Sequence, residues 1–244
     1  MNPDCALSIE HLEVSYHHDP VLQVRDLCLP ASQRIAILGP NGAGKSTLIK
    51  AVLGLIPACA DGVRFLGQPL RQMRRRIAYV PQRSEIDWDY PITVAETVLM
   101  GRYAHLRLLQ RISHEDRRIA RDAMEKLGIA DLANRHISAL SGGQQQRCFL
   151  ARAIAQQADI YLFDEPFAGV DIKTEKAIAK LFEQLSKEGK TIISVHHDLN
   201  TVESYFDYAV LLNRRLLASG PLHQTLTNHH LAQAFGGIVL KRLN

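Results

Sequence analysis

Hydrophobic and polar residues alternate along the first thirty residues of the chain. Leu7, Ile9 and Val14 recur at a period close to two, and the same pattern returns over residues 21–29. This period is typical of strands that bury one face. We therefore expect two amphipathic strands, over residues 7–14 and 21–29.

Four shorter segments are almost continuously hydrophobic. They comprise residues 34–38, 160–163, 191–195 and 209–212. Such runs are typical of strands that are buried on both faces of a parallel sheet. Between the second and third runs, residues 172–189 carry hydrophobic residues at helical spacing and end near a glycine, which is the kind of crossover that parallel strands require. The pattern predicts a parallel sheet with helices on its faces.

Residues 86–157 follow a different pattern, because strand runs give way to helical periods. Ala120, Ala123 and Met124 recur at helical spacing after Ser113, a residue type suited to cap a helix. We expect a helical subdomain inserted into the α/β core.

The composition is that of a globular protein. The chain has 244 residues, of which 46% are hydrophobic and 22% charged, which excludes disordered, collagen-like and coiled-coil classes. The length allows one to two domains, and a single core with an insertion fits it.

The charge balance gives little reason to expect nucleic acid as a partner. The formal net charge is only +4. Arginines gather in two clusters: Arg71, Arg74, Arg75 and Arg76, then Arg107, Arg111, Arg117, Arg118 and Arg121. Acidic residues interrupt the second cluster, so a solvated face is favoured over a phosphate track.

The four cysteines are far apart in the sequence. Cys5, Cys28, Cys59 and Cys148 show no metal-site spacing, so neither a zinc site nor a disulfide framework is expected, and a reducing cytosol fits best. The sequence shows neither a signal-peptide pattern nor an apolar run of membrane-spanning length, so any membrane role is expected to come through a partner.

The strongest chemical signal is the sequence GPNGAGKST at residues 39–47. It matches the phosphate-loop pattern and lies between a predicted buried strand and a predicted helix. Its glycines allow backbone N–H groups to converge on phosphate oxygens at a helix N-terminus. Lys45 would meet the outer phosphates, and the Ser46 hydroxyl would bind Mg²⁺.

Two further motifs carry polar residues that could meet a nucleotide. In IYLFDE, a buried strand ends in Asp164 and Glu165; the first carboxylate could hold Mg²⁺ and the second could activate water. In LSGGQQQR, residues 140–147 precede a helix whose N-terminus could bind an anion. On general grounds Ser141 could equally be a simple helix cap.

The order of the motifs along the chain resembles that in the nucleotide-binding subunits of ATP-binding cassette transporters. The motifs are GPNGAGKST, VPQ at 80–82, LSGGQQQR, IYLFDE and VHHDL at 195–199. The resemblance extends over residues 7–220. It implies an α/β phosphate-loop NTPase of RecA-like type, with a mainly parallel sheet, an N-terminal antiparallel β subdomain and an inserted α-helical subdomain. It further implies one ATPase domain, with residues 1–85 and 158–220 as core, 86–157 as helical subdomain and 221–244 as tail.

The resemblance also implies roles for individual residues. The ATP phosphates would be bound by Gly39, Pro40, Asn41, Gly42, Ala43, Gly44, Lys45, Ser46 and Thr47. Gln82 would join Ser46 and Asp164 around Mg²⁺, with Glu165 and His197 at the attacking water. His197 is preferred over His196 because the family has a variable residue followed by His-Asp-Leu. Tyr16 would stack on adenine, although a core tyrosine is the alternative.

The family's site is shared between two chains. Ser141, Gly142, Gly143 and Gln144 match its signature residues, and Asp171 matches the aspartate that crosses to the other subunit. The resemblance therefore implies a homodimer at the cytoplasmic face of the cell membrane. It would work with an integral membrane permease and an extracytoplasmic substrate-binding protein, without nucleic acid.

Several segments are similar in amino-acid sequence to the cassette subunits of importers of manganese, zinc or chelated iron. Residues 84–94 lie where the family contacts its permease, and Trp88 and Tyr90 would either form an apolar socket there or pack inside the helical subdomain. The alternatives are the same ATPase role for a different cargo, namely an iron chelate, a vitamin or an exported compound, or a soluble cassette ATPase acting on ribosomes or DNA. The His17/His18 and His229/His230 pairs are expected to be solvent-exposed polar residues rather than a metal sensor.

Overall fold

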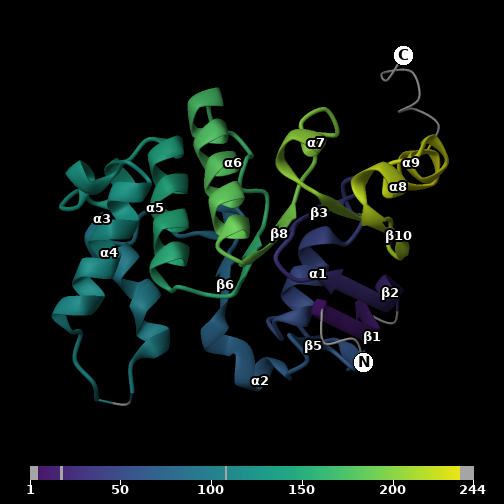
Figure 1. The fold of residues 1–244 in the computed structure, drawn as a ribbon, viewed down its shortest axis with the longest axis horizontal. Coiled ribbons are helices and arrows are strands. Elements are labelled where there is room, and N and C mark those ends of the chain that lie inside the picture. The colour runs from purple at the N-terminus through teal and green to yellow at the C-terminus, as the bar shows by residue number, and fades with distance from the viewer. Residues whose placement is uncertain (1–4, 17–18, 108, 237–244) are drawn as a thin grey trace. The chain divides into compact units, whose positions relative to one another are not determined.

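The computed structural model describes residues 5–16, 19–107 and 109–236 (Figure 1). The chain forms two compact units, Met1–Met73 with Phe182–Asn244, and Arg74–Leu181. Strands β6 and β7, which the predicted boundaries assign to the core, belong to the second unit. The division into a core, an inserted subdomain and a tail stays a prediction.

The first unit begins with an antiparallel hairpin. Strands β1 (Cys5–Tyr16) and β2 (Asp19–Pro30) pair along their length, and β4 (Cys59–Asp61) and β5 (Arg64–Phe65) add to β1. The alternating residues Leu7, Ile9 and Val14 are at most 2% exposed. The two amphipathic strands predicted from the sequence are therefore confirmed, and each extends beyond its predicted ends.

Four more strands of this unit run in the order β10-β9-β3-β8. Their bounds are β3 Arg34–Leu38, β8 Thr191–Val195, β9 Tyr208–Leu212 and β10 Leu216–Pro221. Strand β3 is parallel to β8 and to β9, whereas β10 is antiparallel to β9. The hydrophobic runs thus predicted three strands correctly. Strand β10 was not predicted, because only one of its six residues is buried.

Short helices complete the first unit (Figure 1). They are α1 (Lys45–Val52), α2 (Leu70–Met73), α7 (Val202–Tyr205), α8 (Leu222–Thr225) and α9 (Asn228–Phe235).

The second unit combines two parallel strands, β6 (Ile77–Val80) and β7 (Ile160–Phe163), with helices. The helices are α3 (Val94–Leu99), α4 (His114–Lys126) and α5 (Gly142–Ala155), with 3₁₀ turns η1 (Arg74–Arg76), η2 (Arg83–Glu85), η3 (Met100–His105), η4 (Ala130–Leu132) and η5 (Ile137–Ala139). Helix α6 (Ile172–Lys187) begins in this unit and ends in the first.

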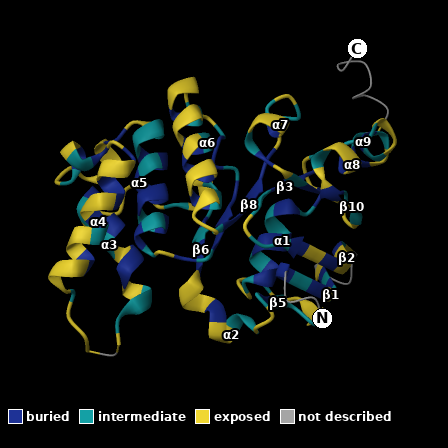
Figure 2. Cartoon of the chain, in the orientation of Figure 1, coloured by how far each residue is buried: buried dark blue, intermediate teal, exposed yellow. Residues whose placement is uncertain are grey.

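Helix α4 follows its sequence signals closely. The Ser113 hydroxyl accepts a hydrogen bond from the Asp116 N–H, and the Asp116 carboxylate accepts one from the Ser113 N–H. Ala120 and Ala123 lie on its buried face, while its other face is exposed (Figure 2). Asp116 also pairs with the buried Arg102 at 3.0 Å, which holds the helix start inside the unit.

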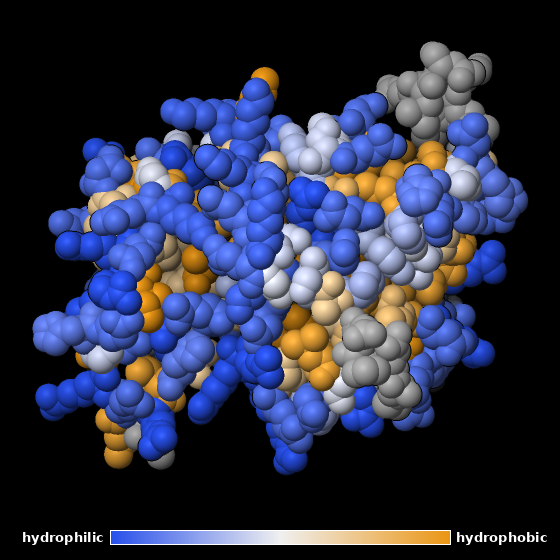
Figure 3. All heavy atoms as spheres, in the orientation of Figure 1, coloured by the Kyte–Doolittle hydropathy of each residue, from blue (hydrophilic) through white to orange (hydrophobic). Residues whose placement is uncertain are grey.

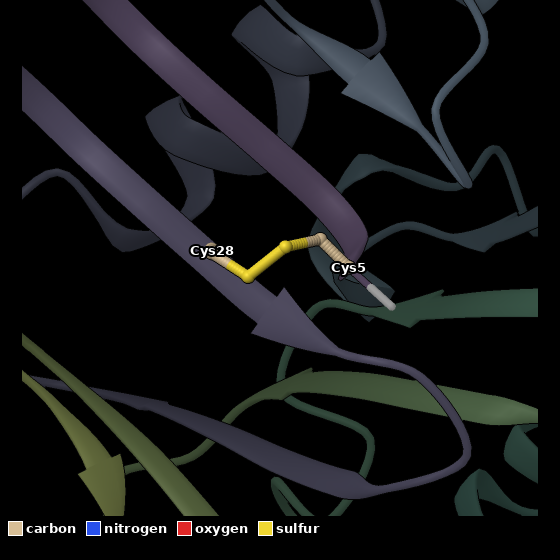
Figure 4. The surroundings of a disulfide bond; sticks show 2 residues. All are labelled: Cys5 and Cys28. Carbon is tan, nitrogen blue, oxygen red and sulfur yellow. A yellow bond between two sulfur atoms is a disulfide. The ribbon is translucent and has the colours of Figure 1, made fainter. Parts of the chain in front are cut away.

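One expectation about the cysteines is wrong. Cys5 and Cys28 form a disulfide that joins β1 to β2, with 5.6 Å between their Cα atoms (Figure 4). The antiparallel register brings residue 28 opposite Ser8, beside the start of β1. Spacing along the sequence cannot reveal this pairing, since it depends on how two strands align.

The face drawn in Figure 3 is mostly hydrophilic, with separate hydrophobic patches. The arginines of both predicted clusters are exposed, as expected of a solvated face. Among the helices of the described residues, none combines the length and hydropathy needed to cross a bilayer.

Candidate functional site

Two functional segments leave one edge of the first unit. Strands β3 and β8 are parallel neighbours in which Ile37 pairs with Val195, and the His196 N–H donates to the Ile37 carbonyl at 3.0 Å. The segments after Leu38 and after Val195 therefore start side by side. Carboxyl ends of parallel strands are the usual place for ligands in α/β proteins.

The loop after β3 folds back tightly before helix α1. Gly39 has a φ of 154°, and a Cβ there would lie 2.2 Å from the Leu212 carbonyl oxygen, so a side chain does not fit. Gly42 and Gly44 also have positive φ, as the predicted curl of the loop requires. The first turn of α1 contains no acidic residue, so its positive end can receive an anion.

Lys45 lies at the centre of this loop. Its ammonium group donates to the carbonyl oxygens of Gly39 and Pro40, at 2.9 Å each, and the residue is only 6% exposed. The side chain is thus fixed over the loop by main-chain acceptors.

The two adjacent histidines after β8 have different surroundings. His196 is 1% exposed, and its Nε2 lies 3.0 Å from the Thr201 hydroxyl. Burial, and to a lesser extent the neighbouring His197, lower the pKa of His196 to about 4. His197 is exposed at the same edge as the phosphate loop. Of the two, His197 is therefore the exposed histidine, and its contact with a nucleotide stays a prediction.

The second unit has its own functional edge. Strands β6 and β7 are parallel with Val80 opposite Phe163, and the Asp164 N–H donates to the Val80 carbonyl at 3.0 Å. Gln82 and Glu165 follow these strands, and the Gln82 amide donates to the Glu165 carboxylate at 3.1 Å. This contact joins two predicted site residues that are far apart in the sequence, and no sequence motif predicts the hydrogen bond between them.

The carboxylates at this edge differ in environment. Asp164 is 2% exposed. Burial of Tyr79, together with the nearby negative charge of Asp164, raises the pKa of the Tyr79 hydroxyl. Glu165 is only partly buried, and its φ of 51° is unusual for a residue other than glycine. Such a conformation stores on the order of 1 kcal/mol of strain and is often found where a side chain must point to a ligand.

The signature residues form the start of helix α5. Ser141 is the N-cap: its N–H donates to the Gln144 side chain at 2.8 Å, and its hydroxyl accepts from the Gln144 N–H at 3.4 Å. Ser141 is therefore a helix cap, one of the two expectations for it. The N–H groups of a helix's first turn have no carbonyl acceptor within that helix. An anion-binding role for this turn therefore stays a prediction.

Asp171 lies beside this turn within the second unit. Its carboxylate accepts from the Thr174 N–H at 2.9 Å and from the Thr174 hydroxyl at 3.0 Å, at the start of α6. These hydrogen bonds lower the pKa of Asp171. A Cβ on Gly143 would lie 3.2 Å from an Asp171 carboxylate oxygen, so the aspartate closes one side of the signature turn.

The structure separates the two expectations for residues 84–94. Trp88 packs edge-on against Phe149 of α5, at 5.1 Å between ring centroids, whereas Tyr90 is 59% exposed. Trp88 is thus partly buried against the helix of its own unit, whereas Tyr90 is exposed.

The remaining sequence predictions give mixed outcomes. Tyr16 ends strand β1, and its side chain, like the His17/His18 pair, lies outside the described residues. His230 is held by its contact with the Thr225 carbonyl, at 3.0 Å. Across the described ranges, no cluster of three or more His, Cys, Asp or Glu side chains could hold a metal ion.

The predicted Mg²⁺ residues have suitable donor chemistry. A serine hydroxyl, a glutamine amide oxygen and one buried carboxylate are the hard oxygen ligands that Mg²⁺ accepts. The ion keeps several waters and takes its other ligands from phosphates, so it does not need a cage of carboxylates. Each of Ser46, Gln82 and Asp164 therefore offers the kind of oxygen ligand that the ion takes, and their joint binding of Mg²⁺ stays a prediction.

Comparison with known proteins agrees with this geometry. Residues 22–168 match the model of the ABC transporter family. The chain is 49% identical to the manganese transport system ATP-binding protein MntB of Bacillus subtilis, covering 95% of this chain and 92% of that protein. It is 48% identical to the zinc transport system ATP-binding protein TroB of Treponema pallidum, covering 98% and 90%.

A solved structure supports the same assignment. The fold matches a chain of a metal-chelate type ABC transporter in an inward-facing conformation, with a TM-score of 0.82 and 28% identity, covering 95% of this chain and 89% of that one. The chain belongs to the ABC transporter family, as an ATP-hydrolysing subunit.

Proposed function

We propose that this subunit powers the import of a metal ion, manganese, zinc or iron, across the cell membrane. The observation that carries the proposal is the near full-length similarity to ATP-binding proteins of manganese and zinc transport systems. Such a subunit acts from the cytoplasmic face through an integral membrane permease, and an extracytoplasmic substrate-binding protein delivers the metal.

Each of the predicted site residues has a role in ATP binding or hydrolysis. The loop at residues 39–47 binds the phosphates, with Lys45 on the outer ones. Glu165 accepts the proton of the attacking water, and His197 holds that water and the γ-phosphate. Ser46, Gln82 and Asp164 would hold Mg²⁺, which would neutralise charge on the phosphates. Tyr16 stacks on the adenine ring.

The functional form is a homodimer with ATP at its interface. Ser141, Gly142, Gly143 and Gln144 of each chain complete the site of the other, and Asp171 lies next to them. Supporting this arrangement, the first turn of α5 has no acidic residue of its own to compete with an anion at its N–H groups. ATP would hold the two chains together, and its hydrolysis would release them.

Metal uptake in a deletion strain tests the proposed function. Radiolabelled manganese, zinc and iron are offered separately, and the strain is complemented with the intact gene or with Lys45→Ala. We expect the deletion strain to lose uptake of one of the three metals. The intact gene should restore that uptake, and the Lys45→Ala gene should not. Unchanged uptake of all three metals would contradict the proposal.

A further inference from the structure

Arg83 follows Gln82 directly and contacts the signature helix. Its Nε and Nη2 donate to the Gln145 side-chain oxygen, at 3.2 and 2.7 Å. Gln145 is 5% exposed, and its amide donates to the Ile137 carbonyl at 3.2 Å. A buried acceptor that is itself fixed therefore takes two hydrogen bonds from one guanidinium group.

Trp88 fixes Arg83 a second time. The indole N–H donates to the Arg83 carbonyl at 3.0 Å, and the guanidinium lies 5.8 Å from the indole ring centre. Trp88 in turn packs on Phe149, which lies one turn beyond Gln145 on α5. The residues after Gln82 are thus attached to the same face of α5 through both Gln145 and Phe149.

The guanidinium also lies against the backbone of the signature turn. A Cβ on Gly142 would lie 2.8 Å from Arg83 Nη1, and a Cβ on Gly143 would lie 2.9 Å from the Thr174 hydroxyl. Arg83 therefore borders the turn at Gly142, and the Asp171–Thr174 pair borders it at Gly143. Both glycines leave the room that these neighbours need.

The charge of Arg83 is informative, because a cation near the N-terminus of a helix destabilises the helix itself. No residue within the first turn of α5 is acidic, but the Asp171 carboxylate lies on the Gly143 side of the turn. The turn is therefore bordered by a cation at Gly142 and by an anion at Gly143, and the charge of Arg83 offsets that of Asp171. The hydrogen bonds to Gln145 hold the charge there.

We infer that Arg83 is a positioning residue that ties the signature turn to the Gln82 segment, so that the turn meets the nucleotide of the other chain correctly. Gln82 contacts Glu165, and the next residue contacts the signature helix, so one short segment aligns both. This inference rests on the proposed homodimer and adds a specific residue to it.

The test measures ATP binding and ATP turnover separately in Arg83→Ala, Arg83→Lys and the unaltered chain. Lys45 and its loop belong to the other unit, so we expect ATP affinity of the variants to stay within about twofold. The kcat of Arg83→Ala should fall roughly tenfold, since small errors in alignment are costly in catalysis. Arg83→Lys should recover part of the loss, because it keeps the charge without the paired hydrogen bonds.

A double-mutant cycle with Gln145→Ala identifies the contact. If Arg83 acts through Gln145, the double variant should be no slower than Arg83→Ala by more than about twofold. Arg118→Ala is the matched control, since this arginine makes paired hydrogen bonds to Glu115 on the exposed face of α4; its kcat should not change.

Three results would overturn the inference: an unchanged kcat in Arg83→Ala, additive losses in the double variant, or an ATP affinity that falls in parallel with turnover. If Arg83→Ala does not fold, the lysine variant decides, by showing either a kcat loss at normal affinity or none. Failure of the proposed function looks different, because metal uptake in the deletion strain would then be unchanged, whatever the ATP turnover of the Arg83 variants.

Discussion

The two functional edges of this protein are built by different means. In the first unit, main-chain atoms position the residues: Lys45 is held by two carbonyls, and Gly39 closely approaches the Leu212 carbonyl. In the second unit, side chains position one another, as Gln82 does with Glu165 and Arg83 with Gln145. The first edge carries the proposed phosphate loop together with His197, whereas the second carries the proposed base, Glu165.

This comparison predicts that damage to the second edge affects turnover and leaves binding intact. In Glu165→Gln the proposed base is lost but the side chain keeps its size, so we expect kcat to fall about 100- to 1000-fold. ATP titration should give an affinity close to that of the unaltered chain, and size exclusion should detect an ATP-trapped dimer. An unreduced kcat would remove Glu165 from catalysis.

Damage to the first edge should affect binding itself. Lys45→Ala removes a charged donor to phosphate, which is worth roughly 1.5–3 kcal/mol, or about 10- to 100-fold in ATP affinity. Isothermal titration without turnover measures this directly. An affinity equal to that of the unaltered chain would mean that the main chain alone binds ATP.

The buried His196 makes the first unit sensitive to acid. Its folded-state pKa of about 4 lies below the ordinary value of 6.5, so between these values the unfolded chain binds the proton more readily. Stability is therefore complete above about pH 6.5 and is lost as the pH falls toward 4, by about 3 kcal/mol in total. Urea unfolding of the unaltered chain and of His196→Phe should differ in slope with pH. Parallel profiles would contradict the assignment.

The disulfide should stabilise the first unit without changing its chemistry. Closing a loop of 23 residues is worth roughly 3 kcal/mol on the chain-entropy model. Reduction, or the Cys5→Ser/Cys28→Ser double variant, should lower the free energy of unfolding by that amount. ATP affinity at low temperature should stay within about twofold. A large loss of affinity would show that the hairpin also shapes the nucleotide site.

The difference between the two edges also explains what the sequence could predict. A backbone-built loop needs certain residues in consecutive positions, so the run at 34–38 and GPNGAGKST were enough to predict the phosphate loop, whereas His197 after the run at 191–195 was chosen through the family resemblance. The helix cap at Ser113 was equally local. That the separate motifs belong to one nucleotide site was inferred from their order along the chain, through the family resemblance. The hydrophobic periodicity did not predict it.

Contacts between distant side chains could not be predicted in this way. The Gln82–Glu165 and Arg83–Gln145 hydrogen bonds depend on tertiary packing, and the Cys5–Cys28 disulfide depends on strand register. Strand β10 was missed because main-chain pairing with β9, rather than a hydrophobic run, defines it. The side chain of Tyr16 lies outside the described residues, so its contact with adenine stays a prediction.

A mixing experiment tests most directly whether two chains share each ATP. Lys45→Ala disables the phosphate loop and Gly143→Asp disables the signature turn, so each variant alone should be inactive. When they are mixed in equal amounts, half of the dimers should combine both variants and contain one intact site. We predict recovery of roughly a quarter of the unaltered ATPase rate. Complete absence of recovery, with both variants folded and mixed dimers demonstrated, would contradict the shared site.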